Sequence, residues 1–279
     1  MKLYRTLNGI VVENGNAFSR IEADWDTLVC DADPIARVTE ALRLGTPATD
    51  PLQDKAGNLL PPVGRQELWA SGVTYKRSRS ARMEESQQSG GDSFYDKVYR
   101  AERPELFFKA APHRIAGHGG PVRIRRDSDW NVPEPELTLL LSPKGEVSGY
   151  TLGNDMSSRS IEGENPLYLP QAKSYEGSAA VGPCIWLSAE PPAPDTEISL
   201  QIRRSGKPVF EGSVALSQIK RRFEELAHWL YRELDFPYGC LLMTGTGIVP
   251  PNDFTLAPGD VIAISMPPIG TLENTVARS

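Results

Sequence analysis

Strand-like segments dominate the chain from Glu105 onward, and this pattern limits the possible folds more than any other feature. Segments such as LFFKA, ELTLLLS, AVGPCIWL and DVIAISM are short, apolar and separated by Gly, Pro and polar residues. One strong apolar stripe at helical spacing interrupts them and predicts a helix over about 217–234, with its apolar face formed by Ile219, Phe223, Leu226, Leu230 and Leu234. Because strands and helices do not alternate, a Rossmann-type sheet is not expected. The sequence predicts a mainly β protein with some α-helix (α+β).

Residues 1–64 are predicted to form a small N-terminal α/β domain, followed by a larger domain over 65–279. Asn8-Gly9 and Asn14-Gly15 separate three short strand-like segments, and Asn-Gly is a strong hairpin signal because both residues tolerate positive φ. Asp33 and Pro34 are suited to begin a helix, as cap and first-turn residue. The proline-rich stretch at 59–64 predicts the connection between the two domains.

Composition limits the possible partners and compartment. The 279 residues include 30 basic and 36 acidic side chains, a net charge of −6, which disfavours a long contact with nucleic acid. No stretch approaches the roughly 20 apolar residues that span a bilayer. The start, MKLYRTLNGIVVENG, lacks the apolar run of a signal peptide. Three cysteines form no metal-binding pattern. A reduced, cytoplasmic protein that binds neither nucleic acid nor membrane is expected.

The segment 76–100, called here the lid segment, differs in composition from its surroundings. It is rich in Arg, Glu, Ser and Gln, contains Gly90-Gly91 and has few side chains suited to burial. One interpretation is a solvated helix and loop. The other is a lid of the catalytic domain that closes over a site and excludes water.

Two glutamates at the start of a predicted strand indicate a metal site. Glu134 and Glu136 are two residues apart, so both side chains project from one face of the strand. Two carboxylates this near to each other repel unless a cation or a proton lies between them. Oxygen ligands of this kind suit Mg²⁺, Mn²⁺ or Ca²⁺. The alternative is an exposed pair on a strand edge.

A third carboxylate is expected beside this pair. If the next strand returns as a hairpin across Lys144-Gly145, Asp155 lies at the end that carries the glutamates. The alternative for Asp155 is a turn or a helix cap. Lys173 near a cation would titrate closer to neutrality and could move protons, whereas the alternative is a solvated surface lysine. The segment Thr244–Gly247 is suited to hold a carboxylate, or forms an ordinary turn.

Seven ordered motifs together resemble the fumarylacetoacetate hydrolase superfamily over about residues 68–279. These motifs are SGVTYKRS, ERPELFFKA, EPELTLLL, GYTLGNDMSSR, QAKSYEGSAAVGP, TGTGIVPPNDFTLAPGDVI and IGTLENTV. The resemblance implies a mixed β-roll and a divalent cation, Mg²⁺ with Mn²⁺ or Ca²⁺ as substitutes. It implies that Glu134, Glu136 and Asp155 hold this cation and that Lys173 lies next to the substrate. It also implies a homodimer or homotetramer.

The lid segment departs from the pattern of the hydrolases in this superfamily. They commonly carry a histidine and a glutamate there to activate water, but the three histidines of this chain, His113, His118 and His228, lie elsewhere. The branch without this pair, and the one that the chain most resembles, is the 2-keto-3-deoxy-sugar-acid dehydratases. This resemblance implies a hydro-lyase of pentose catabolism that acts through an enolate stabilised by the metal, such as one converting 2-keto-3-deoxy-D-arabinonate to 2,5-dioxopentanoate.

The same resemblance implies roles for individual residues. Lys173 is assigned as the base at C3 and Glu105 as the acid for the C4 hydroxyl, although these two roles can be exchanged. Further candidate contacts to the substrate are Ser78, Arg82, Arg159 and Thr246. Two other functions remain open. One is a hydrolase or decarboxylase acting on an acylpyruvate-like diketone, and the other is an inactive protein that binds metal and keto acid.

Overall fold

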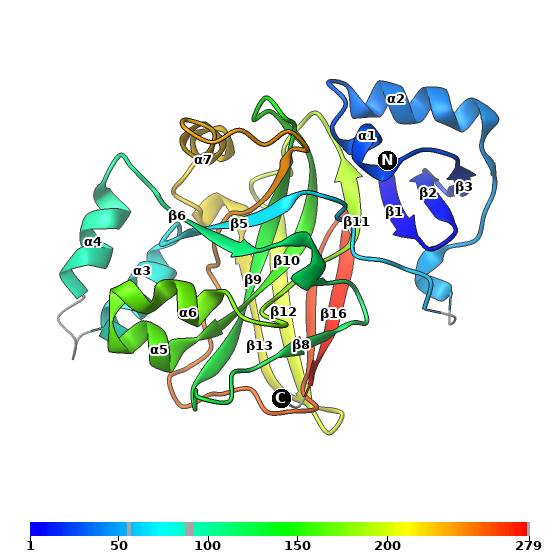
Figure 1. Ribbon diagram of the computed structural model, residues 1–279. Helices are drawn as coiled ribbons and strands as arrows, with labels where there is room; N and C mark the ends of the chain where they lie inside the picture. Colours follow the sequence, from blue (N-terminus) through cyan, green and yellow to red (C-terminus); the bar gives the residue numbers. More distant parts are fainter. Residues whose placement is uncertain (55–56, 87–91, 278–279) are drawn as a thin grey trace.

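The computed structural model describes residues 1–54, 57–86 and 92–277, and two β-sheets dominate it (Figure 1). Within these residues the larger sheet has the strand order β4-β3-β2-β1-β11-β10-β9-β14-β5-β6, and β7 pairs with β11. The smaller sheet has the order β13-β12-β15-β16-β8. Most pairs are antiparallel, whereas β14–β5, β11–β7 and β16–β8 are parallel. The predicted mainly β fold with some α-helix is confirmed.

Predicted strand segments such as LFFKA, AVGPCIWL and all but the first residue of DVIAISM lie in strands, and the two sheets contain further strands that were not predicted. The larger sheet contains β1 (Lys2–Thr6), β2 (Gly9–Asn14), β3 (Ala17–Ile21), β4 (Thr46–Pro47), β5 (Glu67–Gly72), β6 (Glu105–Ala110), β7 (Ile115–Ala116), β9 (Asn131–Leu141), β10 (Val147–Ser158), β11 (Ala179–Leu187) and β14 (Cys240–Met243). The smaller sheet contains β8 (Pro121–Arg123), β12 (Glu197–Arg204), β13 (Lys207–Ala215), β15 (Val261–Met266) and β16 (Gly270–Ala277). Short 3₁₀ turns are η1 (Leu42–Leu44), η2 (Pro51–Gln53), η3 (Pro112–Arg114), η4 (Pro166–Tyr168) and η5 (Leu216–Gln218).

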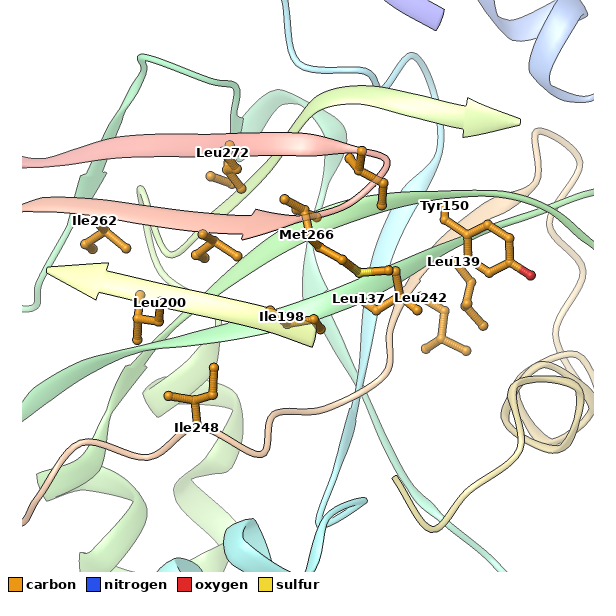
Figure 2. Packing of buried hydrophobic residues seen from close by; sticks show 14 of the residues in the cluster. Leu137, Leu139, Tyr150, Ile198, Leu200, Leu242, Ile248, Ile262, Met266 and Leu272 are labelled. Atoms are coloured by element: carbon orange, nitrogen blue, oxygen red, sulfur yellow. The ribbon is translucent and has the colours of Figure 1, made fainter. Parts of the chain in front are cut away.

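The main hydrophobic core lies between the two sheets. Leu137 and Leu139 of β9 belong to one buried cluster with Leu200 of β12, Ile262 of β15 and Leu272 of β16 (Figure 2). Burial alternates along β12 and β15, because one face of each strand covers this core and the other is more exposed. In contrast, every residue of β9 is buried. The core therefore holds β9 firmly on both faces.

The N-terminal strands continue the larger sheet, since β1 pairs with β11 (Figure 1). The helices α1 (Trp25–Val29) and α2 (Pro34–Ala41) follow them, and Asp33 caps α2 by accepting a hydrogen bond from the Ala36 N–H at 2.9 Å. A second buried cluster joins Leu28 and Val38 of these helices to Leu140 of β9. The division of the chain into two domains at residue 64 stays a prediction.

Two helices make up the described part of the lid segment. They are α3 (Lys76–Ser86) and α4 (Asp92–Arg100), and residues 87–91 between them lie outside the described residues. α3 packs against α4 and against α5 (Arg159–Glu164), which in turn contacts α6 (Leu169–Lys173). These four helices gather on one side of the sheets, away from α1 and α2 (Figure 1).

The helix predicted over 217–234 is shorter than expected, and this prediction was wrong at both ends. The α7 helix spans only Phe223–Leu230. Before it, Ile219 forms a β-bridge with Tyr75, and the Lys220 N–H donates to the Thr74 carbonyl at 2.9 Å. After it, the side chain of Leu234 is 42% exposed. The residues before α7 thus pair with the start of the lid segment instead of continuing the helix.

Arg221, in this same connection, holds the end of α4. Its guanidinium donates to the carbonyls of Val98, Ala101 and Glu102 at 3.2, 2.7 and 2.9 Å. These carbonyls lie at a helix C-terminus, where a cation is favourable. The lid segment is therefore anchored at its C-terminal end to the segment preceding α7. Among the described residues, no helix is long and apolar enough to cross a membrane.

Candidate active site

The β9–β10 hairpin brings three carboxylates together. Asp155 pairs with Glu134 and Gly153 pairs with Glu136, which confirms the hairpin predicted across Lys144-Gly145. One carboxylate oxygen of each of Glu134, Glu136 and Asp155 lies within 4.8 Å of the others. Glu134 is 6% exposed, Glu136 1% and Asp155 0%. The alternative of two exposed glutamates on a strand edge is therefore wrong.

Two glycines lie in tight positions next to the carboxylates. A Cβ added at Gly153, which pairs with Glu136, would lie 2.5 Å from the Thr138 Oγ1 and 2.6 Å from the Met243 Cε, so these side chains would have to shift. Gly245 has a φ of +92°, and its N–H donates to the Glu136 Oε2. The predicted carboxylate-holding loop at 244–247 thus contacts a carboxylate of the protein itself.

Two buried lysines form ion pairs with these carboxylates. Lys173 Nζ donates to the Glu134 Oε2 at 2.6 Å, to the Asp155 Oδ2 at 3.0 Å and to the Ser157 Oγ at 2.5 Å. Lys109 Nζ lies 2.6 Å from the Asp155 Oδ1. Both lysines are 0% exposed, so the surface alternative for Lys173 is wrong. Lys109 was not predicted, although a single lysine within the apolar segment LFFKA was a signal for it.

Opposite charges shift the pKa values of Lys173 and Glu134 in opposite directions. Burial alone would lower the pKa of Lys173, but the nearby carboxylates of Asp155 and Glu134 outweigh burial and raise it. Burial would raise the pKa of Glu134, but Lys173 and Arg159 lower it. The expectation that Lys173 titrates near neutrality therefore does not hold for the charges of the protein alone.

Glu136 carries an excess of negative charge that suits a cation. Burial and the neighbouring charges of Asp155 and Glu134 raise its pKa well above the ordinary range. A carboxylate in this position is stabilised when positive charge is added beside it. Three buried carboxylates with oxygen atoms this close fit a hard divalent cation such as Mg²⁺.

Glu105 lies at the start of β6, opposite Gly72 of β5. The residue as a whole is partly exposed, but its Oε2 is buried and makes no hydrogen bond within the described residues. Burial raises the pKa of Glu105, against the opposing charges of Arg82 and Lys173. The carboxyl group of Glu105 is therefore in the poorly hydrated environment that a proton donor requires.

Two of the four predicted substrate contacts are arginines held in buried ion pairs. Arg82 of α3 lies 2.8 Å from Glu162, and Arg159 Nη2 donates to the Glu134 Oε1 at 2.6 Å. Glu162 was not predicted. Its signal was an acidic residue three positions after Arg159, on the same face of a helix.

The two hydroxyl candidates are used in local hydrogen bonds. Ser78 Oγ donates to the Tyr75 carbonyl at 2.9 Å, at the first turn of α3. Thr246 Oγ1 accepts from the Ile248 N–H at 3.1 Å. Contacts of Ser78, Arg82, Arg159 and Thr246 with a substrate stay predictions.

Comparisons with known proteins agree with this geometry. The family model described as fumarylacetoacetate (FAA) hydrolase C-terminal matches residues 76–277. A probable 2-keto-3-deoxyxylonate dehydratase of Haloferax volcanii is 46% identical over 216 residues, which cover 77% of this chain and 73% of that protein. A 2-dehydro-3-deoxy-D-arabinonate dehydratase of Saccharolobus solfataricus is 44% identical over 219 residues, which cover 78% and 74%.

A solved structure is similar over the whole chain. It is 2-keto-3-deoxy-D-arabinonate dehydratase complexed with magnesium and 2,5-dioxopentanoate, with a TM-score of 0.85 and 36% sequence identity. The match covers 100% of this chain and 99% of the other. The similarity therefore includes the N-terminal strands as well as the carboxylate site.

Proposed function

The chain belongs to the fumarylacetoacetate hydrolase family, and on this basis we propose that it catalyses the magnesium-dependent dehydration of a 2-keto-3-deoxy sugar acid. The observation that carries this function is the buried cluster of three carboxylates with Lys173 and Glu105 beside it. The enzyme is a hydro-lyase, and 2-keto-3-deoxy-D-arabinonate, which yields 2,5-dioxopentanoate, is its expected type of substrate.

Glu134, Glu136 and Asp155 hold the Mg²⁺ ion in this proposal. When bound, the cation supplies positive charge that stabilises the negative charge developing on the 2-keto acid as its C3 proton leaves. Gly245 and Arg159 orient the glutamates, through hydrogen bonds to the Glu136 Oε2 and the Glu134 Oε1. Mn²⁺ and Ca²⁺ use the same oxygen ligands and are expected to substitute.

Proton transfer is assigned to Lys173 and Glu105. Lys173 takes the C3 proton through its Nζ, which Ser157 holds in place, after the Nζ has itself lost a proton. A cation held by Glu134, Glu136 and Asp155 would favour this neutral form of the lysine. Glu105 gives a proton to the C4 hydroxyl, so the C4–O bond breaks and water leaves. A proton then moves from C5 to C3 with the help of Glu105, which leaves an enol between C4 and C5. This enol becomes the C5 aldehyde when C4 gains a proton and the C5 hydroxyl loses one. Exchange of the two roles is compatible with the same geometry.

Four polar side chains are proposed to contact the substrate. Arg82 and Arg159 carry positive charge that suits the substrate carboxylate, and Ser78 and Thr246 offer hydroxyl groups for its hydroxyls. Ser78 and Arg82 lie on α3, so the lid segment would supply part of the site.

A substrate panel tests the proposed function. We expect 2-keto-3-deoxypentonates to yield the semialdehyde, detected by a coupled aldehyde dehydrogenase, and acylpyruvates to remain intact. The lid segment contains no histidine that would activate water for cleavage. Cleavage of acylpyruvates without any dehydration of 2-keto-3-deoxypentonates would overturn the proposal.

A single added methyl group tests the position of Glu105. A Cβ at residue 72 would lie 2.0 Å from the Glu105 Oε2, which is too close for both atoms to stay in place. We expect Gly72→Ala to remain folded but to lower kcat by about 100-fold, since a misplaced catalytic group costs about this much. Gly212→Ala, in β13, is the matched control, because its nearest contacts are side chains at 3.1 Å or more. Equal kcat values for the two variants would contradict this placement of Glu105.

The enzyme is further proposed to act in the cytoplasm, in pentose catabolism, as a homodimer or homotetramer. All three cysteines, Cys30, Cys184 and Cys240, are free thiols, which suits a reducing compartment. Exposed apolar side chains such as Leu44 and Leu167 are candidates for contacts between subunits. Sedimentation velocity measures the oligomeric state, and a monomer at all concentrations would contradict this proposal.

A further inference from the structure

The carboxylate of Glu162 lies among three cationic side chains from three different helices. Its Oε2 is 2.8 Å from the Arg82 Nη1 on α3 and 3.5 Å from the Arg159 Nη1 on its own helix, α5. Its Oε1 is 3.3 Å from the Lys173 Nζ at the end of α6. The side chain of Glu162 is 1% exposed. A carboxylate buried this deeply is costly unless its cationic partners stay in place.

The arrangement connects the lid segment to the proposed base. Arg82 lies on the lid helix α3, and Lys173 contacts both Glu162 and the carboxylates of Glu134 and Asp155. Movement of α3 away from α5 would separate Arg82 from Glu162 and leave the Glu162 carboxylate to Lys173 and Arg159 alone. Lys173 would then be held more strongly at Glu162, because the positive charge of Arg82, which repels Lys173, has moved away.

We propose that Glu162 is a positioning residue that couples closure of the lid segment to the orientation of Lys173. This inference rests on the proposed function only for the role of Lys173 as a base. With the lid segment closed, Arg82 holds one oxygen of Glu162 and the other oxygen orients the ammonium group. With the lid segment open, the Lys173 Nζ is misplaced relative to the substrate C3. The enzyme therefore removes the C3 proton only when the site is closed to water.

Hydrogen exchange tests the coupling without any need for turnover. In the wild-type enzyme, Mg²⁺ with pyruvate should slow the exchange of residues 76–86. In Glu162→Gln this protection should be lost, although Arg82, the proposed contact to the carboxylate of pyruvate, is still present. Glu164→Gln, an exposed position on the same helix, is the matched control and should keep the wild-type protection. Full protection in Glu162→Gln would overturn the coupling.

Kinetics and metal binding separate a positioning role from other roles. We expect Glu162→Gln to lower kcat by about 100-fold, as for a misplaced catalytic group, with Mn²⁺ affinity unchanged in a titration. The Arg82→Gln/Glu162→Gln double variant should be no slower than Arg82→Gln, to within about twofold, because the loss of Arg82 already breaks its contact with Glu162. Multiplied effects in the double variant, or a parallel loss of Mn²⁺ affinity, would overturn the proposal.

A second variant guards against misfolding, and the activity of the wild-type enzyme separates failure of this proposal from failure of the proposed function. Glu162→Asp keeps the negative charge but shortens the side chain, and the same measurements are made on it if Glu162→Gln does not fold. Failure of the wild-type enzyme to dehydrate any 2-keto-3-deoxy acid would overturn the proposed function. The exchange of residues 76–86 would still report whether Glu162 couples to the lid segment.

Discussion

We expect the removal of divalent cations with EDTA to abolish turnover and added Mg²⁺ or Mn²⁺ to restore it. Glu134, Glu136 and Asp155 are buried and place their oxygens within 4.8 Å of one another, so their negative charges need a cation for the reaction as well as for their own stability. The measurement is initial rate against added metal, with elemental analysis of the chelated protein. Full activity in a protein shown to contain no metal would contradict the assignment of this site.

The Glu136→Gln variant tests whether the dependence on metal comes from Glu136, one of the three proposed ligands. The substitution preserves the shape of the side chain and removes its charge, and burial with the charges of Asp155 and Glu134 already raises the pKa of Glu136. We therefore expect a folded protein with greatly weakened Mg²⁺ binding in calorimetry. Glu146→Gln, at the exposed far end of the same hairpin, is the matched control and should bind Mg²⁺ normally.

We expect Lys173→Met to lower turnover strongly while leaving metal binding largely intact. The Lys173 Nζ is the proposed acceptor of the C3 proton, and methionine fills a similar volume without any basic group. Loss of a base of this kind lowers the rate by about 10²–10⁴-fold or more. Exchange of the C3 hydrogens of pyruvate with D₂O, followed by NMR, should also stop. Continued exchange in this variant would show that another group removes the proton.

Glu105→Gln distinguishes the acid from the base. We expect dehydration to fall by about 10²–10⁴-fold, because the C4 hydroxyl then leaves without a proton. The exchange of C3 hydrogens with D₂O should persist, since this step needs only the base and the metal. If Lys173→Met keeps the exchange and Glu105→Gln loses it, the two roles are reversed.

The cluster of three carboxylates could be predicted because its signals are local. The i, i+2 spacing of Glu134 and Glu136 places both side chains on one face of a strand, whatever the rest of the fold. A glycine turn and two apolar strands then determine the hairpin that brings Asp155 opposite Glu134. The ordered motifs added the identity of the cation and the class of the reaction.

Burial of charged residues could not be predicted in the same way. The signals for Lys109 and Glu162 in the sequence are weak, because a charged side chain is buried only when its partners arrive from distant segments. Lys109 of β6 forms an ion pair with Asp155 of β10, and Glu162 of α5 forms one with Arg82 of α3. The direction in which the charges of the protein alone shift the pKa of Lys173 could not be predicted for the same reason, since the effect of several nearby carboxylates depends on their distances.

The sequence by itself determined the mainly β fold, the hairpin with its three carboxylates, and the family to which the chain belongs. These depend on the spacing of residues along strands and on the order of motifs. Only the tertiary structure decided where α7 begins and ends, how Arg221 anchors the lid segment, and which buried cations face which carboxylates. Each of these depends on contacts between residues far apart in the chain, whose free energies become defined only when the packed arrangement brings them together.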